Sequence, residues 1–257
     1  MKRSPILVGY FTMVRKDFIR IVRIWSQTLL PPVITMSLYF AIFGAFIGSQ
    51  VADIHGFPYI QFIVPGLIMM SIITSAYMNT VSTFYFAKWT RTIDELLVSP
   101  MPSWTVIAGF VSGGLMRAFM VGALVTIVSL FFTHLTLFNA GVIFGAVFLT
   151  ALLFSLLGLI NGIYAKSFDA ISIVPTFVLT PLTYLGGIFY SIDQLPEFFR
   201  ILSLGNPILY MVNAFRYGFL GISDVPLGLA FGVMGGLTVA AFILTIYLFI
   251  RGAGLKQ

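Results

Sequence analysis

The chain has 257 residues, of which 59% are hydrophobic and only 9% are charged, whereas soluble domains carry about 25% charged residues. It contains 14 Lys and Arg, 8 Asp and Glu and no cysteine, which gives a net charge of +6. This composition excludes a soluble enzyme, a disordered chain and a disulfide scaffold, and it predicts an integral membrane protein whose basic residues face anionic lipid rather than nucleic acid.

Residues 1–25 are predicted to form an amphipathic helix before the first membrane span. Apolar residues recur at steps of three and four while basic residues fill other positions, which is typical of a helix in the membrane interface. The alternative is a basic flank that only sets the topology. The apolar positions are Leu7, Phe11, Val14, Phe18, Ile21, Val22 and Trp25, and the basic ones are Arg15, Lys16, Arg20 and Arg23.

Residues 26–250 are predicted to form an all-α domain with six membrane-spanning helices. A helix that crosses a bilayer needs ~20 mainly apolar residues, and six segments of the chain reach that length. The alternating segments of about ten residues that a membrane β-barrel requires are not seen. The six predicted spans are 26–48, 60–84, 105–131, 140–164, 171–190 and 226–250, and residues 251–257 follow as a cytoplasmic tail.

The basic residues predict the orientation of these spans. With the N-terminus in the cytoplasm, eleven of the 14 Lys and Arg fall in cytoplasmic segments. Two, Arg200 and Arg216, fall outside, and Arg117 lies within a span. Because cytoplasmic loops carry an excess of Lys and Arg, we expect both termini in the cytoplasm.

No residue of the chain is expected to catalyse a reaction or to hold a cofactor or a metal. All eight acidic residues fall outside the predicted spans, so the intramembrane acid that proton-coupled carriers generally use is missing. The nucleotide-binding pattern G-x-x-x-x-G-K-[ST] is also missing, because the sequence has no Gly-Lys pair. If the chain moves a solute, the energy must come from another polypeptide.

The predicted cytoplasmic loop 87–104 contains a short helix. Thr92 and Glu95 have the spacing of a capping box, and Pro100 ends the helix. One face of this helix is apolar, at Ile93, Leu96 and Leu97. A rigid helix tethered at both ends to spans could transmit motion from a cytosolic partner; the alternative is a surface helix that rests on lipid.

Arg117 lies near the middle of the third predicted span, where an arginine costs ~2.5–3.5 kcal/mol on insertion scales. No acidic residue lies in a predicted span to pair with it. Three roles stay open. It could bond to backbone carbonyls, Asn79, Asn161 or a hydroxyl group, it could attract anionic head groups on a substrate route, or it could snorkel to the membrane surface.

Glycine pairs at four-residue spacing predict close contacts between helices. Random placement of the glycines would give about two such pairs, and the sequence has six. The contacts could lie within one subunit or between two copies. The pairs are Gly44 and Gly48, Gly109 and Gly113, Gly141 and Gly145, Gly158 and Gly162, Gly228 and Gly232, and Gly232 and Gly236.

The predicted outer segment 191–225 is too long for a turn and too apolar for a solvated loop. Two apolar runs, 195–202 and 208–215, are separated by Gly205-Asn206-Pro207. We expect two half-length helices that dip into the outer leaflet as a re-entrant hairpin. The alternative is a pair of helices lying flat on the outer surface.

Aromatic residues make up 16% of the chain, and three of them stand at the end of the fifth predicted span. Tyr184, Phe189 and Tyr190 could line an outer constriction of a solute route. They could equally serve ordinary packing.

Four stretches of the sequence resemble the permease subunits of ABC-2 type transporters, in particular the compact bacterial inner-membrane members of that family. The resemblance covers nearly the whole chain, since the stretches and the six spans follow in the family's order. The stretches are Phe62–Met70, Glu95–Pro100, Thr180–Tyr190, and Asn206–Tyr210 with Phe215–Gly218.

The resemblance implies a homodimer that sits on two copies of a separate cytosolic ATPase, which would bind ATP and Mg²⁺. The loop helix would be the coupling helix that enters the ATPase, helix 1–25 would be the interfacial connecting helix, and 191–225 would form the outer hairpin. The coupling residues would be Arg91, Thr92, Ile93, Asp94, Glu95, Leu96, Leu97 and Pro100, and those of the outer motif Asn206, Pro207, Tyr210 and Arg216.

The substrate implied by the resemblance is a lipid, a lipid-linked saccharide or a hydrophobic drug, moved across the bacterial inner membrane. Two alternatives stay open. The chain could be the permease of a polysaccharide exporter, or it could be a non-transporting membrane scaffold that docks a cytosolic partner.

Overall fold

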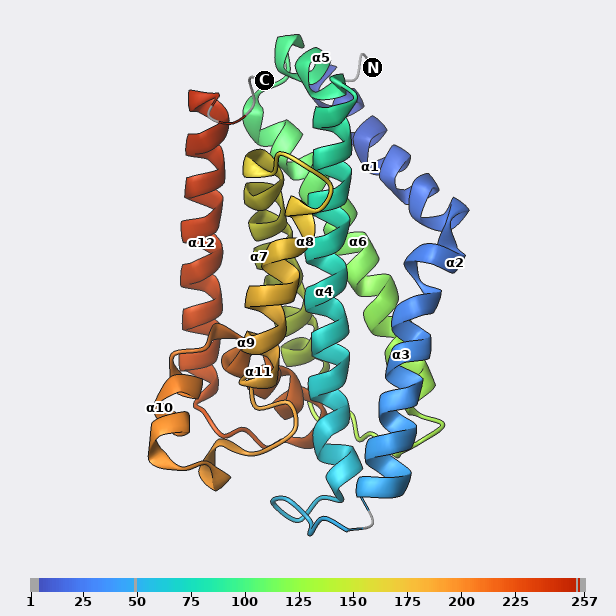
Figure 1. Ribbon diagram of the computed structural model, residues 1–257, viewed down its shortest axis with the longest axis vertical. Helices are drawn as coiled ribbons and strands as arrows, with labels where there is room; N and C mark the ends of the chain where they lie inside the picture. The colour runs from blue at the N-terminus through green and yellow to red at the C-terminus, as the bar shows by residue number, and fades with distance from the viewer. Residues whose placement is uncertain (1–4, 49, 253, 255–257) are drawn as a thin grey trace.

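The computed structural model describes residues 5–48, 50–252 and 254, and these ranges contain helices and no β-strand. Most helices run along the long axis of one bundle, and the start of α1 and the end of α12 lie at the same end as α5 (Figure 1). The α-helices are α1 (Pro5–Arg23), α2 (Trp25–Thr28), α3 (Leu30–Ala41), α4 (Tyr59–Trp89), α5 (Thr92–Val98), α6 (Ser103–Ser129), α7 (Ala140–Tyr164), α8 (Ala170–Val174), α9 (Thr180–Tyr184), α10 (Glu197–Leu204), α11 (Pro207–Leu220) and α12 (Leu227–Arg251).

Five helical segments in the described part of the chain are long and apolar enough to cross a membrane. They are Trp25–Gly44, Tyr59–Trp89, Ser103–Ser129, Ala140–Tyr164 and Leu227–Arg251. The first includes α2, α3 and the start of the π-helical segment η1 (Ile42–Ile47). These five correspond to five of the six predicted spans, which confirms an all-helical, multi-span protein.

The fifth predicted span, 171–190, forms a shorter helix than expected. α8, the π-helical segment η2 (Pro175–Leu179) and α9 make one apolar helix over Ala170–Tyr184. Its 15 residues extend about 22 Å, whereas the hydrocarbon core of a bilayer is ~30 Å thick. The helix stops because Gly186 and Gly187 follow, and Gly187 has a φ of +69°, which is outside the helical region.

The core of the bundle surrounds α4, of which 78% is buried over its most apolar window. A Cβ atom on Gly158 of α7 would lie 2.6 Å from the Tyr77 carbonyl oxygen of α4, and one on Gly162 would lie 2.8 Å from the Phe84 ring. Glycine therefore sets the close approach of α7 to α4. On Gly228 and Gly232 of α12, in contrast, an added Cβ atom would meet nothing within 4 Å, so the predicted contacts hold for only some of the pairs.

The predicted N-terminal amphipathic helix is α1, and it packs against the bundle through a mixed side that carries Ile21 and Met13 as well as polar residues. Tyr10 shares a 2.8 Å hydrogen bond with Ser112 of α6, and Asp17, only 5% exposed, lies against Gly113 of the same helix. The apolar residues Leu7 and Phe11 are exposed instead. The sequence predicted the helix, but not that the bundle would bury Ile21 and the Asp17 carboxylate on one side of it.

The predicted outer segment contains two helices that differ in burial. α10 exposes its apolar residues, with Phe198 and Ile201 each more than 60% exposed. α11 has 14 residues, most of them buried, and packs among α4, α7 and α12. Two similar half-helices were expected, whereas only α10 has an open apolar face.

Candidate functional site

The helix of the inner loop, α5, is fixed to the end of α4. It begins at Thr92 and ends at Val98, as predicted, and Ile93 is buried with 1% exposure. The predicted capping box does not form, because no side chain caps the helix. Instead Arg91 adopts a left-handed conformation with a φ of +59°, and this sharp turn starts α5 directly after α4.

The outward side of α5 mixes acidic and apolar residues. Asp94 and Glu95 are exposed in the first turn, and Leu97 and Val98 are 40% and 87% exposed. Leu97 was expected to share the face of Ile93, but it points away from the bundle. Pro100 follows, also exposed, before α6 begins. α5 therefore presents a small exposed surface and is held in place by the long helices on either side of it, α4 and α6.

Lys88, which the sequence placed simply among the cytoplasmic basic residues, anchors this end of the bundle. Its ammonium group is buried and donates hydrogen bonds to the carbonyl oxygens of Ile163 and Ala165, at 2.7 and 3.2 Å. The carbonyl groups at a helix end lack partners within the helix. Lys88 thereby ties the end of α4, next to α5, to the end of α7.

Arg117 of α6 donates a 3.0 Å hydrogen bond from Nη2 to the carbonyl oxygen of Thr28. Thr28 is the last residue of α2, which lies before the helical break at Leu29. A structural bond to a backbone carbonyl was one of the three roles left open by the sequence. The bond fastens the first span to α6 at the point where the helix is interrupted.

The three aromatic residues after the fifth predicted span cluster at the end of the molecule opposite α5. The rings of Tyr184 and Phe189 stack at 5.8 Å, and Phe189 also lies 5.1 Å from the ring of Phe43 in η1. The Tyr190 hydroxyl donates to the Tyr184 carbonyl oxygen at 3.2 Å. The structure thus brings these residues together and joins them to the first span.

Asn206, Pro207 and Tyr210 of the outer motif shape the start of α11. The Asn206 side chain accepts a hydrogen bond from the Ile208 amide and donates one of 2.6 Å to the Leu182 carbonyl oxygen of α9. Pro207 occupies the first helical position, where no amide donor is needed. The Tyr210 hydroxyl donates to the Leu204 carbonyl oxygen of α10 at 2.8 Å. The motif therefore connects α9, α10 and α11.

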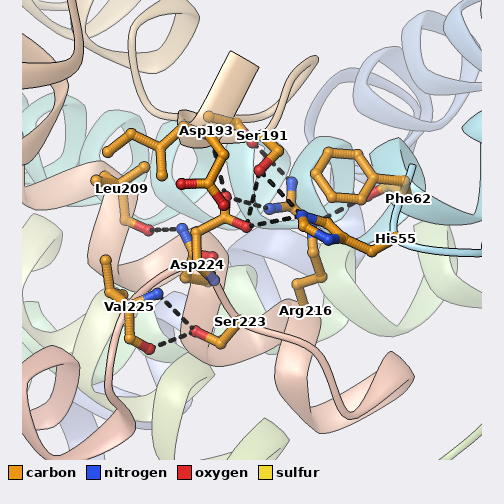
Figure 2. A network of polar contacts seen from close by, with 12 residues as sticks. His55, Phe62, Ser191, Asp193, Leu209, Arg216, Ser223, Asp224 and Val225 are labelled. Atoms are coloured by element: carbon orange, nitrogen blue, oxygen red, sulfur yellow. Dashed lines mark hydrogen bonds and ion pairs between the residues drawn. The ribbon is translucent and has the colours of Figure 1, made fainter. Parts of the chain in front are cut away.

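Arg216, which the sequence counted as an outer basic residue, is completely buried in a polar network (Figure 2). It donates to the carbonyl oxygens of Phe62, at 3.2 Å, and Gly187, at 2.7 Å, and its guanidinium lies 3.7 Å from the centre of the Phe62 ring. Its Nη1 is 4.0 Å from an Asp224 oxygen. Arg216 holds α11, α4 and the loop after α9 together.

Asp224 is the acidic centre of this network. Its carboxylate accepts hydrogen bonds from the Ser191 hydroxyl and the Ile192 amide, at 3.0 and 3.2 Å, and lies 3.5 Å from His55 Nε2 (Figure 2). Its own amide donates to the Asn213 side chain at 2.8 Å. The sequence carried no signal for this pairing, because Asp224 and its partners come from four separate segments.

His55, Asp193 and Asp224 each place one potential metal-binding atom within 4.8 Å of the others. Both carboxylates, however, have basic partners. Asp193 lies 3.8 Å from Arg200, and Asp224 faces Arg216. The positive charge that these carboxylates need is supplied by arginine, so the geometry fits ion pairing.

α4 has one stripe of side chains that the bundle leaves accessible. The stripe repeats every four residues, as on one face of a helix, and Thr74 is exposed in a stretch of otherwise buried neighbours. The partly or fully exposed positions are Met70, Thr74, Met78, Ser82 and Phe86. A mixed polar and apolar stripe on the most buried helix marks a candidate route face.

Comparison with known proteins places these features in one family. The family model described as ABC-2 type transporter matches residues 9–220. The chain is 57% identical over 242 residues, 94% of each protein, to "Inner membrane transport permease YadH" of Escherichia coli (strain K12). It is 27% identical over 212 residues, 81% of each protein, to "Nodulation protein J" of Rhizobium leguminosarum bv. viciae.

Proposed function

The chain belongs to the ABC-2 type transporter family, as a multi-pass transport permease of the inner membrane, and from this premise we propose that it is the membrane subunit of an ATP-driven exporter. The observation that carries the proposal is α5. It is a seven-residue helix with Ile93 buried and Leu97 and Val98 exposed, set between the 31-residue α4 and the 27-residue α6. Because both ends of α5 are joined to long helices, movement of a partner bound to α5 can move α4 and α6.

In this proposal two copies of the chain assemble with two copies of a cytosolic ATPase, which binds ATP and Mg²⁺. The permease supplies the route and no catalytic group. The accessible stripe of α4 from Met70 to Phe86 supports a second copy, because Thr74 and Ser82 then face a shared route rather than lipid. Exposed residues of α5 and its flanks contact the ATPase, whereas the buried Ile93 fixes α5 to the bundle; the exposed residues are Arg91, Asp94, Glu95, Leu97 and Pro100.

The proposed topology has six crossings with both termini in the cytoplasm. The helix Ala170–Tyr184 runs antiparallel to α7 and ends near α11, which supports a crossing in which the residues up to Tyr190 complete the distance (Figure 1). α10 and α11 form the re-entrant hairpin at the outer end, and α1 lies in the inner interface. The aromatic cluster of Tyr184, Phe189 and Tyr190 forms an outer gate.

The proposed substrate is amphipathic: a lipid, a lipid-linked saccharide or a hydrophobic drug. The mixed hydroxyl and apolar character of the α4 stripe supports such a molecule over a fully polar polysaccharide, which is the second candidate. Arg117, bonded to Thr28, supports the structure next to the route and can attract an anionic head group only if that bond opens.

The test is to reconstitute the chain with its ATPase in liposomes and to measure ATP-driven movement of a fluorescent lipid. The double variant Glu95→Lys, Leu97→Asp should lower transport by at least about tenfold while the dimer stays intact, because a reversed charge and a newly introduced charge both disfavour the contact with the ATPase. The control is Asp53→Lys, which reverses an exposed charge at the opposite end of the molecule.

Two outcomes would contradict the proposal. Normal transport in the double variant would remove α5 as the contact with the ATPase. An ATPase that binds the chain but shows no dependence of its rate on any amphipathic solute would favour a non-transporting scaffold.

A further inference from the structure

A groove at the cytoplasmic end of the bundle combines positive charge, hydroxyl groups and aromatic rings. It has a volume of about 570 Å³ and is lined by residues of α1, α4, α5 and α6 together with Phe168. We call it the inner groove. Its volume lies within the range of about 300–1,000 Å³ that is usual for small-molecule sites.

One wall of the inner groove is basic. Lys16 and Arg20 of α1 face a single carboxylate, Asp17, among the described residues that line it. Asp17 lies 3.5 Å from Arg20 and is 5% exposed. Burial raises the pKa of the Asp17 carboxyl, against the opposing effect of the charges of Arg20 and Lys16. The two positive charges of Lys16 and Arg20 therefore exceed the single negative charge of Asp17.

Arg20 supplies several N–H donors to the groove. Arg20 Nη2 donates to the Asn79 side chain at 2.9 Å and to the Thr83 hydroxyl. Among the described residues that line the groove, one buried N–H group has no hydrogen-bond partner: Nε of Arg20, which lies 3.5 Å from an Asp17 oxygen. Buried donors without partners cost free energy. A ligand that offers anionic oxygen atoms would relieve this cost.

The mouth of the groove is apolar. Phe86 of α4 and Phe168 are 54% and 49% exposed, and the buried Phe110 of α6 lies between the groove and the core. α1 has exposed apolar residues of its own, such as Phe11 and Phe18, on the side away from the bundle. A basic wall next to exposed aromatic rings, beside a helix of this kind, matches a molecule with an anionic head and an acyl tail.

We propose that the inner groove binds the phosphate-bearing head group of an anionic membrane lipid, with Lys16 and Arg20 as the contacts to phosphate oxygens. The acyl chains leave past Phe86, at the edge of the groove. Free phosphate offers the same oxygen atoms, but it would leave the aromatic mouth empty. α5 forms one wall through Thr92 and Leu96, so the bound lipid would brace the helix that meets the ATPase.

The proposal goes beyond transport, because binding is measured on the purified chain without an ATPase. The delipidated full chain in detergent is titrated with phosphatidylglycerol, and binding is counted by native mass spectrometry. We expect one saturable site per chain. Lys16→Gln should weaken it about fivefold, the equivalent of ~1 kcal/mol per basic residue near a membrane surface. Arg20→Gln should weaken it at least about tenfold.

The matched control is Arg23→Gln, an exposed arginine on the same helix that does not line the groove. It should bind like the unaltered chain. If Arg20→Gln does not fold, Lys16→Gln decides the question, since Lys16 is exposed. Equal affinities in Lys16→Gln and in the unaltered chain would overturn the proposal, and so would displacement of the lipid by inorganic phosphate, which would make the free anion the occupant.

Discussion

At the scale of single residues, the sequence identified which polar groups are costly but not which partners they have. Arg117 was visible because it stands alone in an apolar span, yet its partner Thr28 lies 89 positions away. Arg216 looked like an ordinary outer residue, and its bond to Phe62 spans 154 positions. Partners so distant are brought together only by the packing of the helices, which no local pattern reports.

Arg216 provides the prediction at this scale. Arg216→Leu would leave the buried Asp224 carboxylate without its arginine partner and would remove the Arg216 donors from the Phe62 and Gly187 carbonyl oxygens. Removing one member of a buried ion pair generally costs about 3–5 kcal/mol. We expect a large fall in the thermal unfolding temperature of the detergent-purified chain, measured by intrinsic fluorescence.

Two further variants make this prediction specific. Arg216→Lys keeps the charge but not the planar fork of donors, so the fall in its unfolding temperature should be intermediate. Arg200→Leu removes an exposed partner of Asp193 and should cost less than about 1 kcal/mol. An unfolding temperature for Arg216→Leu equal to that of Arg200→Leu would show that the buried network does not stabilise the outer end.

At the scale of elements, regular apolar periodicity predicted the helices well where the chain is locally uniform. The seven-residue helix Thr92–Val98 was found from its charges and from Pro100, although the turn at Arg91 replaced the expected cap. The helix before Tyr190 was predicted too long, because hydropathy does not register the break at Gly187. The deep burial of α11 also went unseen, since it depends on neighbours from α4, α7 and α12.

The glycines of α7 and α12 give a prediction about packing between elements. In Gly158→Ala the new Cβ would meet the Tyr77 carbonyl oxygen at 2.6 Å, so α7 and α4 must separate. Overpacking of this kind costs about 1–3 kcal/mol. Gly232→Ala on α12 meets no atom within 4 Å and should be neutral, or more stable by up to about 1 kcal/mol through helix propensity.

Both variants are compared by the fraction of monodisperse protein that survives heating, read by size-exclusion chromatography with Trp fluorescence. The expected order is Gly232→Ala at or above the unaltered chain and Gly158→Ala below it. The reverse order would mean that the contact between α4 and α7 does not limit the stability of the bundle.

At the scale of the whole molecule, composition and the distribution of basic residues carried most of the inference. Figure 1 shows the start of α1, the end of α12 and α5 at one end and α10 at the other. The excess of Lys and Arg predicts that the end with α5 faces the cytoplasm. The number of crossings is harder to predict, because the helix Ala170–Tyr184 is too short to cross by length alone. Its two flanks must be placed relative to the membrane.

The side of the membrane on which each flank lies can be measured by labelling single cysteines. Because the sequence contains no cysteine, an introduced cysteine is the only thiol in the chain that can react. The single variants Asp94→Cys and Asp169→Cys should react with a membrane-impermeant maleimide only after cells are lysed. Asp53→Cys and Glu197→Cys should react in intact cells whose outer membrane has been permeabilised. All four residues are exposed, so reactivity reports the side of the membrane rather than burial.

The pair Asp169 and Glu197 decides the number of crossings, because these residues flank the helix Ala170–Tyr184. Labelling of Glu197→Cys from outside and of Asp169→Cys only from inside requires that the chain cross between them, which gives six spans. Labelling of both from the same side would leave five crossings and would put the two termini on opposite sides of the membrane. The ATPase could then not reach α5 and the C-terminus from one compartment, and the proposed arrangement with both termini in the cytoplasm would be wrong.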